Sequence, residues 1–302
     1  MRKIIIDTDC GVDDAVAIMM ALSDKRVKVE GITTVSGNVA LENVVDNVLR
    51  ILSYFDRKEI PVFRGASRPL VEKVRRAEGV HGENGLGDVI LPAPSIEERD
   101  LIAPEGLYRI ACENPGITLV TLGPLTNIAI AFNLFPELAS LIGDIVIMGG
   151  AVERGNITRF AEFNFFADPE SAQFVFNTSV PITVIPWDPC FAVMYTEEDL
   201  INLGMEGGKA GEFFLKLQRK PIDYIEKYYG VRAVALPDPA AMACVLDSRT
   251  ALRRVCGNMT LELNYTTMRG ASVLSEGHRM DIILEIDKNR FTELLRQIKA
   301  LD

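Results

Sequence analysis

The chain has 302 residues, of which 48% are hydrophobic and 25% charged, the balance of a globular protein with a sizeable core. Its formal net charge of −10 and isoelectric point near 4.9 exclude a general affinity for nucleic acid or for an anionic membrane surface. We therefore expect a small-molecule partner.

The sequence offers no export or membrane signal. No apolar run reaches the length of a membrane-spanning helix, and the N-terminus turns polar after three isoleucines instead of forming a signal-peptide core. The five cysteines are odd in number, widely scattered and without CxxC spacing. These features indicate a protein of the reducing cytoplasm.

Short β-rich apolar runs alternate with longer helical patterns along the chain. In chain order, we expect strands at residues 3–6, 27–33, 60–63, 117–121, 142–148, 182–185, 259–264 and 282–286. Helical patterns lie at residues 13–22, 43–55, 125–134 and 169–176, and a last helix starts near residue 290. The alternation predicts an α/β fold with an open, mostly parallel but mixed sheet flanked by helices. No linker or repeat divides the chain, so residues 1–302 should form one domain.

Four aspartates follow the first predicted strand within the segment DTDCGVDD, namely Asp7, Asp9, Asp13 and Asp14. Two carboxylates about 4 Å apart repel by roughly 4 kcal/mol at an effective dielectric constant near 20, so such a cluster requires a cation or shared protons. No lysine or arginine in the segment supplies that charge. Asp13 and Asp14 could merely favour the first turn of a helix, but this leaves Asp7 and Asp9 unexplained. The set predicts a metal site.

In open parallel sheets the ligand crevice lies beyond the carboxyl ends of the strands. Polar or small residues follow the other predicted strands as well: Thr34, Asn38, Leu122, Gly123, Met148, Gly149, Gly150, Trp187 and Asp188. We expect the loops that carry them to face one pocket.

The motifs in these loops resemble the inosine-uridine-preferring nucleoside hydrolase superfamily. DTDCGVDD is similar to its DxDxGxDD signature, and cysteine in this motif is typical of a less-characterised branch. The resemblance continues, in the right order, through TTVSGN (33–38), GVHGENGL (79–86), LGPLTNIA (122–129), MGG (148–150), AEFNFFADPESA (161–172) and PDPAA (237–241). It implies a Rossmann-like nucleoside hydrolase fold, and calcium-dependent hydrolysis of ribonucleosides to free base and ribose (EC 3.2.2.-). It further implies a role in purine or pyrimidine salvage and a homodimeric or homotetrameric assembly.

The resemblance also implies roles for individual residues. Ca²⁺ would be held by the hard oxygen ligands of Asp9, Asp14, the backbone carbonyl of Leu122, and Asp238. Asp9 would in addition deprotonate the attacking water. The ribose and its surroundings would be held by Asp13, Asn38 and Asn164 at the 2′- and 3′-hydroxyls, by Asn156 and Glu162 at the 5′-hydroxyl, and by Met148.

Several of these residues also have a purely structural interpretation. Asp238 before a proline is typical of a helix N-cap, Asn156 after Gly155 of a turn, and Asn164 of a strand edge. An extended backbone would place Glu162 and Asn164, two residues apart, on one face, where both could grip one sugar.

The chain departs from the family at Pro237, where the well-known branch has a histidine that acts as acid toward the leaving base. Proline offers no side-chain donor, so the leaving base must be contacted otherwise. Candidates are His81 in the glycine-rich loop, Trp187 by stacking, and Tyr224 with Tyr228, which are one helical turn apart. The aromatic residues could equally pack a core. We assign Cys10 no nucleophilic role.

Two other functions compete with hydrolysis. A phosphatase of the haloacid dehalogenase type also places DxD after a first strand, with Asp7 as the nucleophile and magnesium as cofactor, but the following DD and the missing DG(T/V) turn disfavour it. A non-catalytic ribose or nucleoside sensor would retain the metal site and tolerate Pro237. The segment 65–86, rich in glycine and charge, could close over either ligand as a flap.

Overall fold

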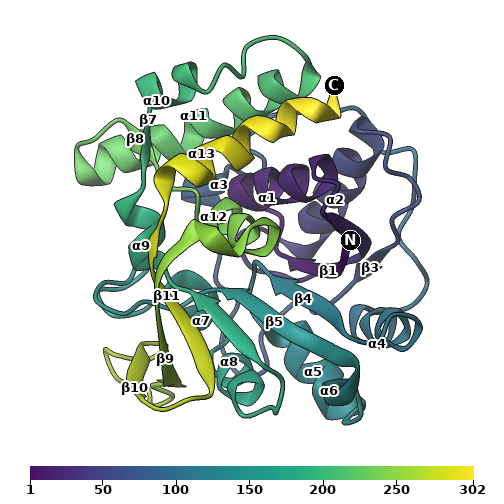
Figure 1. Ribbon diagram of the computed structural model, residues 1–302, viewed down its shortest axis with the longest axis vertical. Coiled ribbons are helices and arrows are strands. Elements are labelled where there is room, and N and C mark those ends of the chain that lie inside the picture. Colours follow the sequence, from purple (N-terminus) through teal and green to yellow (C-terminus); the bar gives the residue numbers. More distant parts are fainter.

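A mixed nine-stranded sheet forms the centre of the computed structural model, which describes all 302 residues (Figure 1). Its strands are β1 (Arg2–Thr8), β2 (Val27–Thr34), β3 (Val62–Arg64), β4 (Ile117–Thr121), β5 (Ile142–Met148), β6 (Ile182–Ile185), β9 (Ala251–Leu261), β10 (Ser272–Glu276) and β11 (Met280–Ile286). They lie in the order β10-β9-β11-β6-β5-β4-β1-β2-β3. Only β9 runs antiparallel to its neighbours β10 and β11. The expected mostly parallel, mixed sheet is confirmed.

Helices cover both faces of this sheet. They are α1 (Val12–Ser23), α2 (Leu41–Tyr54), α3 (Glu78–His81), α4 (Ala103–Glu113), α5 (Thr126–Leu134), α6 (Leu138–Leu141), α7 (Phe163–Ala167), α8 (Pro169–Phe176), α9 (Trp187–Ala192), α10 (Glu197–Asn202), α11 (Lys209–Tyr229), α12 (Pro237–Leu246) and α13 (Lys288–Arg296). Two short 3₁₀ turns occupy Ser248–Thr250 and Gln297–Leu301, and β7 (Tyr195–Thr196) pairs with β8 (Ala233–Val234) outside the main sheet. None of these helices combines the length and apolarity needed to span a bilayer.

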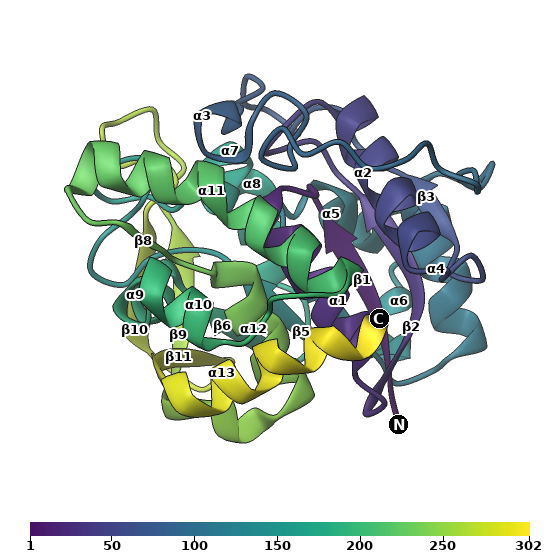
Figure 2. The same cartoon turned by 90° about the horizontal axis from the view of Figure 1, so that it is seen from above.

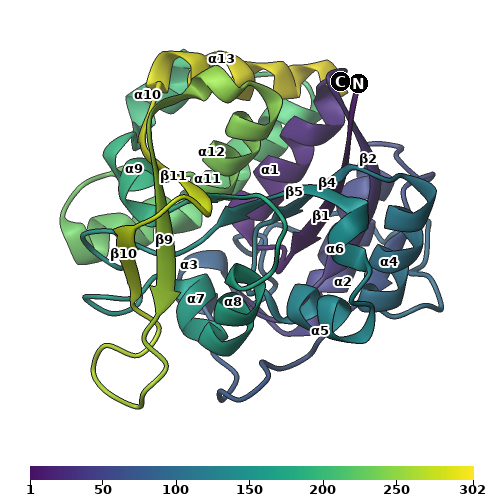
Figure 3. The same ribbon diagram turned by 60° about the horizontal axis from the view of Figure 1, so that its bottom comes forward.

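The alternation of side chains along β1 explains the two layers. Ile4 and Ile6 pack into a core shared with α1, α11, α12 and α13, whereas Ile5 packs into a second core with α4, α5 and α8. Because both faces are buried, the central strands read as continuous apolar runs. Figures 1 and 3 show the two helical layers on opposite sides of the sheet, and Figure 2 shows α11 as the long helix crossing one of them.

Most predicted elements are confirmed, and four of them, β4, β5, β6 and α8, have the predicted bounds. A strand is present at residues 259–261, but the bounds expected for it, 259–264, are wrong, because β9 begins at Ala251 and ends at Leu261. Its first half is largely solvent-exposed and carries Arg253 and Arg254, so the sequence shows no apolar run there. The sequence also gave no expectation for α4 or β10.

Candidate active site

Carboxylates from two packed helices meet beyond the carboxyl end of β1. Asp13 and Asp14 lie in the first turn of α1, and Asp238 lies in the first turn of α12. One carboxylate oxygen from each of the three falls within 4.8 Å of the others. Asp238 follows Pro237 as the second residue of α12, and the N-cap is Leu236, so the N-cap interpretation of Asp238 is wrong.

Asp14 is oriented by a network that includes the turn before α1. Its Oδ1 accepts a hydrogen bond from Thr8 Oγ1 at 2.5 Å, and its Oδ2 accepts from Gly11 N at 2.8 Å and Asn38 Nδ2 at 3.1 Å. The Gly11 contact is part of a helix-capping arrangement. Asp14 therefore caps α1 and belongs to the carboxylate cluster at the same time.

Asp9 is fully buried beside this cluster. Its Oδ2 accepts the Asn38 N–H at 2.7 Å, while its Oδ1 has no hydrogen-bond partner. A Cβ at Gly37 or Gly123 would collide with the Asp9 carboxylate, so both neighbouring loops need glycine to approach it. Asp9 is not among the three carboxylates that lie closest together.

Burial and mutual repulsion disfavour negative charge on these carboxylates, and a bound cation would offset both effects. Burial raises the pKa of Asp13 to about 6. Burial, followed by repulsion from neighbouring carboxylates, raises the pKa values of Asp9, Asp14 and Asp238 above their ordinary range. Asp9 Oδ1 and Asp13 Oδ1 are both buried without a partner. An all-oxygen donor set with orphaned buried carboxylate oxygens fits a hard divalent cation.

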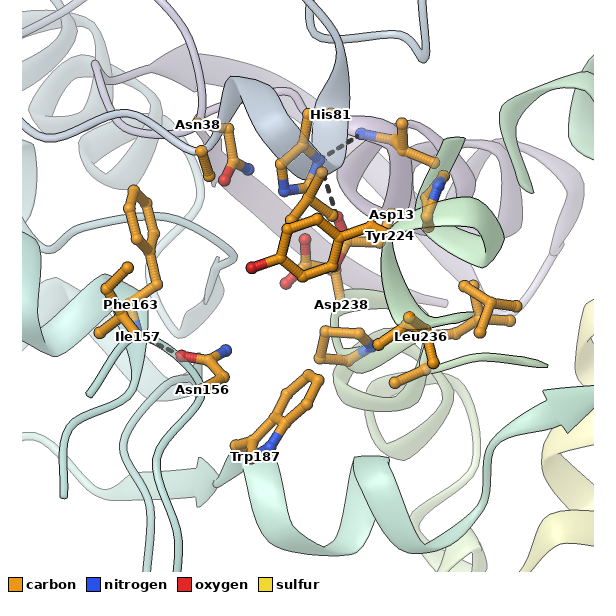
Figure 4. A pocket seen from close by; sticks show the side chains of 18 of the residues that line it. Asp13, Asn38, His81, Asn156, Ile157, Phe163, Trp187, Tyr224, Leu236 and Asp238 are labelled. Atoms are coloured by element: carbon orange, nitrogen blue, oxygen red, sulfur yellow. Dashed lines mark hydrogen bonds and ion pairs between the residues drawn. The ribbon is translucent and has the colours of Figure 1, made fainter. Parts of the chain in front are cut away.

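A pocket opens next to the cluster, and most of the predicted site residues line it: Asp13, Asn38, His81, Leu122, Met148, Asn156, Glu162, Asn164, Trp187 and Asp238. Figure 4 shows side chains from several loops and helices turned toward this space. Asp9 and Asp14 lie behind the lining. Of the residues that follow the other strands, Asn38, Leu122, Met148 and Trp187 line the pocket as expected. Thr34, Gly123, Gly149, Gly150 and Asp188 do not, and Thr34 Oγ1 donates to the Phe63 carbonyl instead.

Glu162 and Asn164 do not lie on an extended strand as the sequence suggested. Glu162 is the N-cap of α7, where its carboxylate accepts the N–H groups of Asn164 at 2.8 Å and Phe165 at 3.2 Å, and also Gly150 N at 2.8 Å. Burial nevertheless raises the pKa of Glu162 to about 7. Asn164 lies in α7 and donates from Nδ2 to the Leu122 carbonyl at 2.8 Å. The two side chains share the pocket because of the helix cap, not because of strand alternation.

His81 enters the pocket as a neutral side chain. Its Nδ1 accepts the Val12 N–H at 3.1 Å, so the proton of the neutral ring is on Nε2. Burial lowers the pKa of His81 to about 4. The ring can therefore donate one hydrogen bond from Nε2, but near neutral pH it is not an imidazolium.

The aromatic side chains are arranged differently from the prediction. Tyr224 lines the pocket, but Tyr228 does not: its ring lies against that of Tyr224, 4.5 Å between centroids, and the residue is 59% exposed. Tyr229 lines the pocket instead. Trp187 is half-buried at the start of α9 and also faces the pocket, so it is not simply a core residue.

Sequence reasoning missed Arg76 and Gln218. Arg76 is the only lysine or arginine among the lining residues and donates from Nη1 to Ser36 Oγ at 2.8 Å. Gln218 is buried, and its Oε1 has no partner. Arg76 lies in the segment expected to form a flap, but nothing in the local sequence indicates that its side chain turns inward.

Two other residues of the first motif are set apart from the pocket. Asp7 is fully buried, and its Oδ1 accepts Thr33 Oγ1 at 2.5 Å and Asn127 Nδ2 at 2.8 Å. It does not line the pocket, which argues against its acting as a phosphatase nucleophile. Cys10 is buried too, and burial followed by the nearby carboxylates keeps its thiol pKa well above the ordinary value. Its thiol therefore stays protonated, in keeping with the absence of a nucleophilic role.

Fold and site together define an α/β enzyme with a carboxylate-lined pocket at the carboxyl edge of its sheet. The family model "Inosine-uridine preferring nucleoside hydrolase" matches residues 4–293. The chain belongs to this nucleoside hydrolase family and is an N-glycosyl hydrolase.

Individual relatives agree with this assignment. A pyrimidine-specific ribonucleoside hydrolase (RihA) of Escherichia coli O81 is 34% identical over 97% of this chain and 96% of its own length. Uridine nucleosidase 1 of Arabidopsis thaliana is 38% identical over 81% of this chain and 74% of its own length. Among solved structures, a plant nucleoside hydrolase matches with a TM-score of 0.94 at 32% identity, covering 99% of both chains. A purine-preferring ribonucleoside hydrolase of Gardnerella vaginalis matches with 0.93 at 29% identity, also over 99% of both.

Proposed function

We propose that the protein hydrolyses the N-glycosidic bond of ribonucleosides in a Ca²⁺-dependent reaction, in which Asp9 takes the proton of the attacking water. The observation that carries the proposal is the group of buried, mutually repelling carboxylates beside a pocket lined by amides and carboxylates. Related proteins that act on pyrimidine, uridine and purine nucleosides support a ribonucleoside as the substrate class.

Asp9, Asp14, Asp238 and the Leu122 carbonyl are the proposed Ca²⁺ ligands, and Asp13, whose carboxylate lies within 4.8 Å of those of Asp14 and Asp238, would face the cation and the sugar together. When bound, Ca²⁺ would supply positive charge that orients hydroxyl groups and lowers the pKa of water. Asp9 Oδ1, buried and without a partner, is then the free oxygen that can accept a proton.

The remaining polar groups of the lining suit a sugar. Asp13, Asn38 and Asn164 would bind the 2′- and 3′-hydroxyls, and Asn156 and Glu162 would bind the 5′-hydroxyl. Glu162 is held by three backbone N–H groups and Asn164 by the Leu122 carbonyl, so both are pre-oriented before the ribose arrives. Such preorganisation favours an oxocarbenium-like sugar in the transition state over a loosely bound ground state.

The leaving base would depart without a histidine at position 237. His81 can donate a hydrogen bond from Nε2, and Trp187, Tyr224 and Tyr229 can surround the base with aromatic surface. These groups stabilise the departing base by hydrogen bonding and stacking and do not deliver a strong acid.

The test is a panel of inosine, adenosine, guanosine, uridine, cytidine and ribosylthymine incubated with protein and Ca²⁺, with free base measured by chromatography. We expect release from at least one nucleoside, and a loss of at least about a hundredfold in the Asp9→Ala variant, since general bases contribute at least that much. Absence of release from every nucleoside, with Ca²⁺ bound and the fold intact, would overturn the proposal.

Pro237 favours a second candidate, a ribonucleoside sensor that binds without hydrolysis. Tight binding of a nucleoside in the same panel, without base release, would support it. We also expect a homodimer or homotetramer, which sedimentation velocity measures directly. The five free cysteines agree with the cytoplasmic location that we expect, which cell fractionation would test. A role in nucleoside salvage follows only if the chain releases free base from nucleosides.

A further inference from the structure

Asp188 was expected to face the pocket, but it does not line it, and its carboxylate accepts hydrogen bonds from a neighbouring loop instead. It lies in the first turn of α9, directly after Trp187. Its Oδ2 accepts the Val152 N–H at 2.7 Å, and its Oδ1 accepts the N–H groups of Glu153 at 3.0 Å and Arg154 at 2.9 Å. Three consecutive backbone donors of the loop after β5 thus converge on one carboxylate.

These bonds are the only hydrogen bonds of the N–H groups of residues 152–154, whereas the preceding residue, Ala151, is held by Ser272, whose Oγ accepts its N–H at 2.8 Å and donates to its carbonyl at 2.6 Å. The next backbone bonds, such as Gly155 N to Arg159 O at 3.1 Å, stay within the loop. Hydrogen bonds from backbone N–H groups to a carboxylate are charge-assisted and stronger than neutral ones. Asp188 therefore fixes the loop to α9.

The anchored stretch leads directly to the pocket. Asn156 comes two residues after Arg154, lines the pocket, and accepts the Phe163 N–H at 2.9 Å through its Oδ1. Figure 4 shows Asn156 and Trp187 along the same edge of the pocket. On the other side of the loop, the Arg154 guanidinium lies 5.5 Å from the ring centroid of Tyr229, another lining residue.

We propose that Asp188 is a positioning residue: by holding the loop before Asn156, it places the Asn156 side chain where it can hydrogen-bond the 5′-hydroxyl of the substrate. This inference rests on the proposed function, because it assigns Asn156 to the 5′ end of a ribonucleoside. Asp188 touches no substrate. Its effect should therefore depend on whether the substrate has the group that Asn156 binds.

The experiment compares a nucleoside with its 5′-deoxy analogue, using uridine and 5′-deoxyuridine where uridine is turned over, or otherwise the best nucleoside of the panel. For Asp188→Ala we expect kcat/KM to fall about tenfold with the full nucleoside, the size of one lost hydrogen bond, and to change less than about twofold with the 5′-deoxy analogue. Asn156→Ala should show the same pattern, and the double variant should lose no more than Asn156→Ala alone. Asp188→Asn, which keeps one acceptor oxygen for two of the three donors, should recover part of the loss.

Asp287→Ala is the matched control, because Asp287 also accepts a backbone N–H as the N-cap of α13 and is not among the pocket-lining residues. It should lower the thermal midpoint without changing the ratio between the two substrates. Equal losses with both substrates in Asp188→Ala, or additive losses in the double variant, would overturn the inference. If the wild-type protein releases no base, the proposed hydrolysis fails, and calorimetric affinities for the same two compounds test the role of Asp188 by the same ratio.

Discussion

Trp187 is the residue that we propose assists the leaving base by stacking, in the absence of a histidine at position 237. It begins α9 at the carboxyl end of β6, its N–H donates to the Gly150 carbonyl at 2.9 Å, and its ring packs 5.4 Å from that of Phe191. The backbone bond holds the start of α9 against the loop after β5, the Phe191 ring packs against the indole, and Pro237 has no side-chain donor to offer a leaving base. In the proposed reaction Trp187 would therefore assist departure of the base by stacking, alongside the hydrogen bond from His81.

We predict that Trp187→Ala lowers kcat/KM about tenfold for purine nucleosides, since an aromatic stacking contact contributes roughly 0.5–1.5 kcal/mol beyond area burial. Trp187→Phe should retain most of the activity. Steady-state base release measures both variants, and Phe174→Ala, a half-exposed aromatic position on α8 away from the pocket, serves as the control. Unchanged purine kinetics in Trp187→Ala would show that the indole does not contact the base.

Whether a site residue could be predicted depended on how far it lies in sequence from the other residues of the site. Asp13 and Asp14 could be placed together because they share one helical turn, and Asp238 could be added only through the family resemblance. Arg76 and Gln218 could not be found, because their approach to the pocket depends on how segment 65–77 and α11 pack against distant elements. Helical spacing pairs Tyr224 with Tyr228, yet Tyr229 lines the pocket instead, because spacing alone does not tell which ring of α11 faces the pocket.

Among the elements, Arg269 connects the hairpin of β9 and β10 to the segment 65–86, for which the sequence suggests a flap. This buried side chain, from the loop that Figure 3 shows extending beyond the sheet, bonds Glu72 of segment 65–86, Glu170 of α8 and the Leu263 carbonyl. Its side chain is 6% exposed, and those of the two glutamates are 10% and 22% exposed. Three segments far apart in sequence therefore meet at one charge.

We predict that Arg269→Met destabilises the protein by about 3 kcal/mol, because it leaves two largely shielded carboxylates without their cation. Urea unfolding measures the change. Arg253→Met is the control, since its pair with Glu285 is more than half exposed and should contribute at most about 1 kcal/mol. An effect of Arg269→Met no larger than that of the control would mean that the flap and hairpin are not joined through this side chain.

The same elements show why part of the fold was hard to predict. The central strands are buried on both faces and therefore read as apolar runs, whereas β9 and β10 lie at the sheet edge and expose much of their length. Helix α11 is amphipathic over 21 residues, yet Pro221 in its interior signals a helix end in sequence. Tertiary packing of Phe213, Phe214 and Leu217 into the core offsets that local cost.

For the whole molecule, the buried carboxylates should make stability depend on pH and Ca²⁺ together. Burial raises the pKa of Asp7 to about 7, of Asp13 to about 6 and of Glu162 to about 7. A carboxyl whose pKa is higher in the folded state than in the unfolded state binds its proton more tightly when folded. It adds stability below its unfolded pKa, near 4, and that stability is lost as the pH rises through about 6–7. His81, with a lowered pKa, acts in the opposite direction but is one group.

We therefore predict that, in EDTA, the free energy of unfolding falls as the pH rises from 5 to 8, at a rate set by about 1.4 kcal/mol for each unit of pKa shift. Ca²⁺ binds the ionised carboxylates, so it should stabilise the protein little at pH 5 and by at least about 2 kcal/mol more at pH 8. Urea unfolding at four pH values, with Ca²⁺ or with EDTA at matched ionic strength, measures the linkage. Because Ca²⁺ would act through the carboxylate cluster, Asp238→Asn should abolish the Ca²⁺ increment while keeping the fold. An increment that is equal at pH 5 and pH 8 would mean that the cation does not replace the protons on these carboxylates.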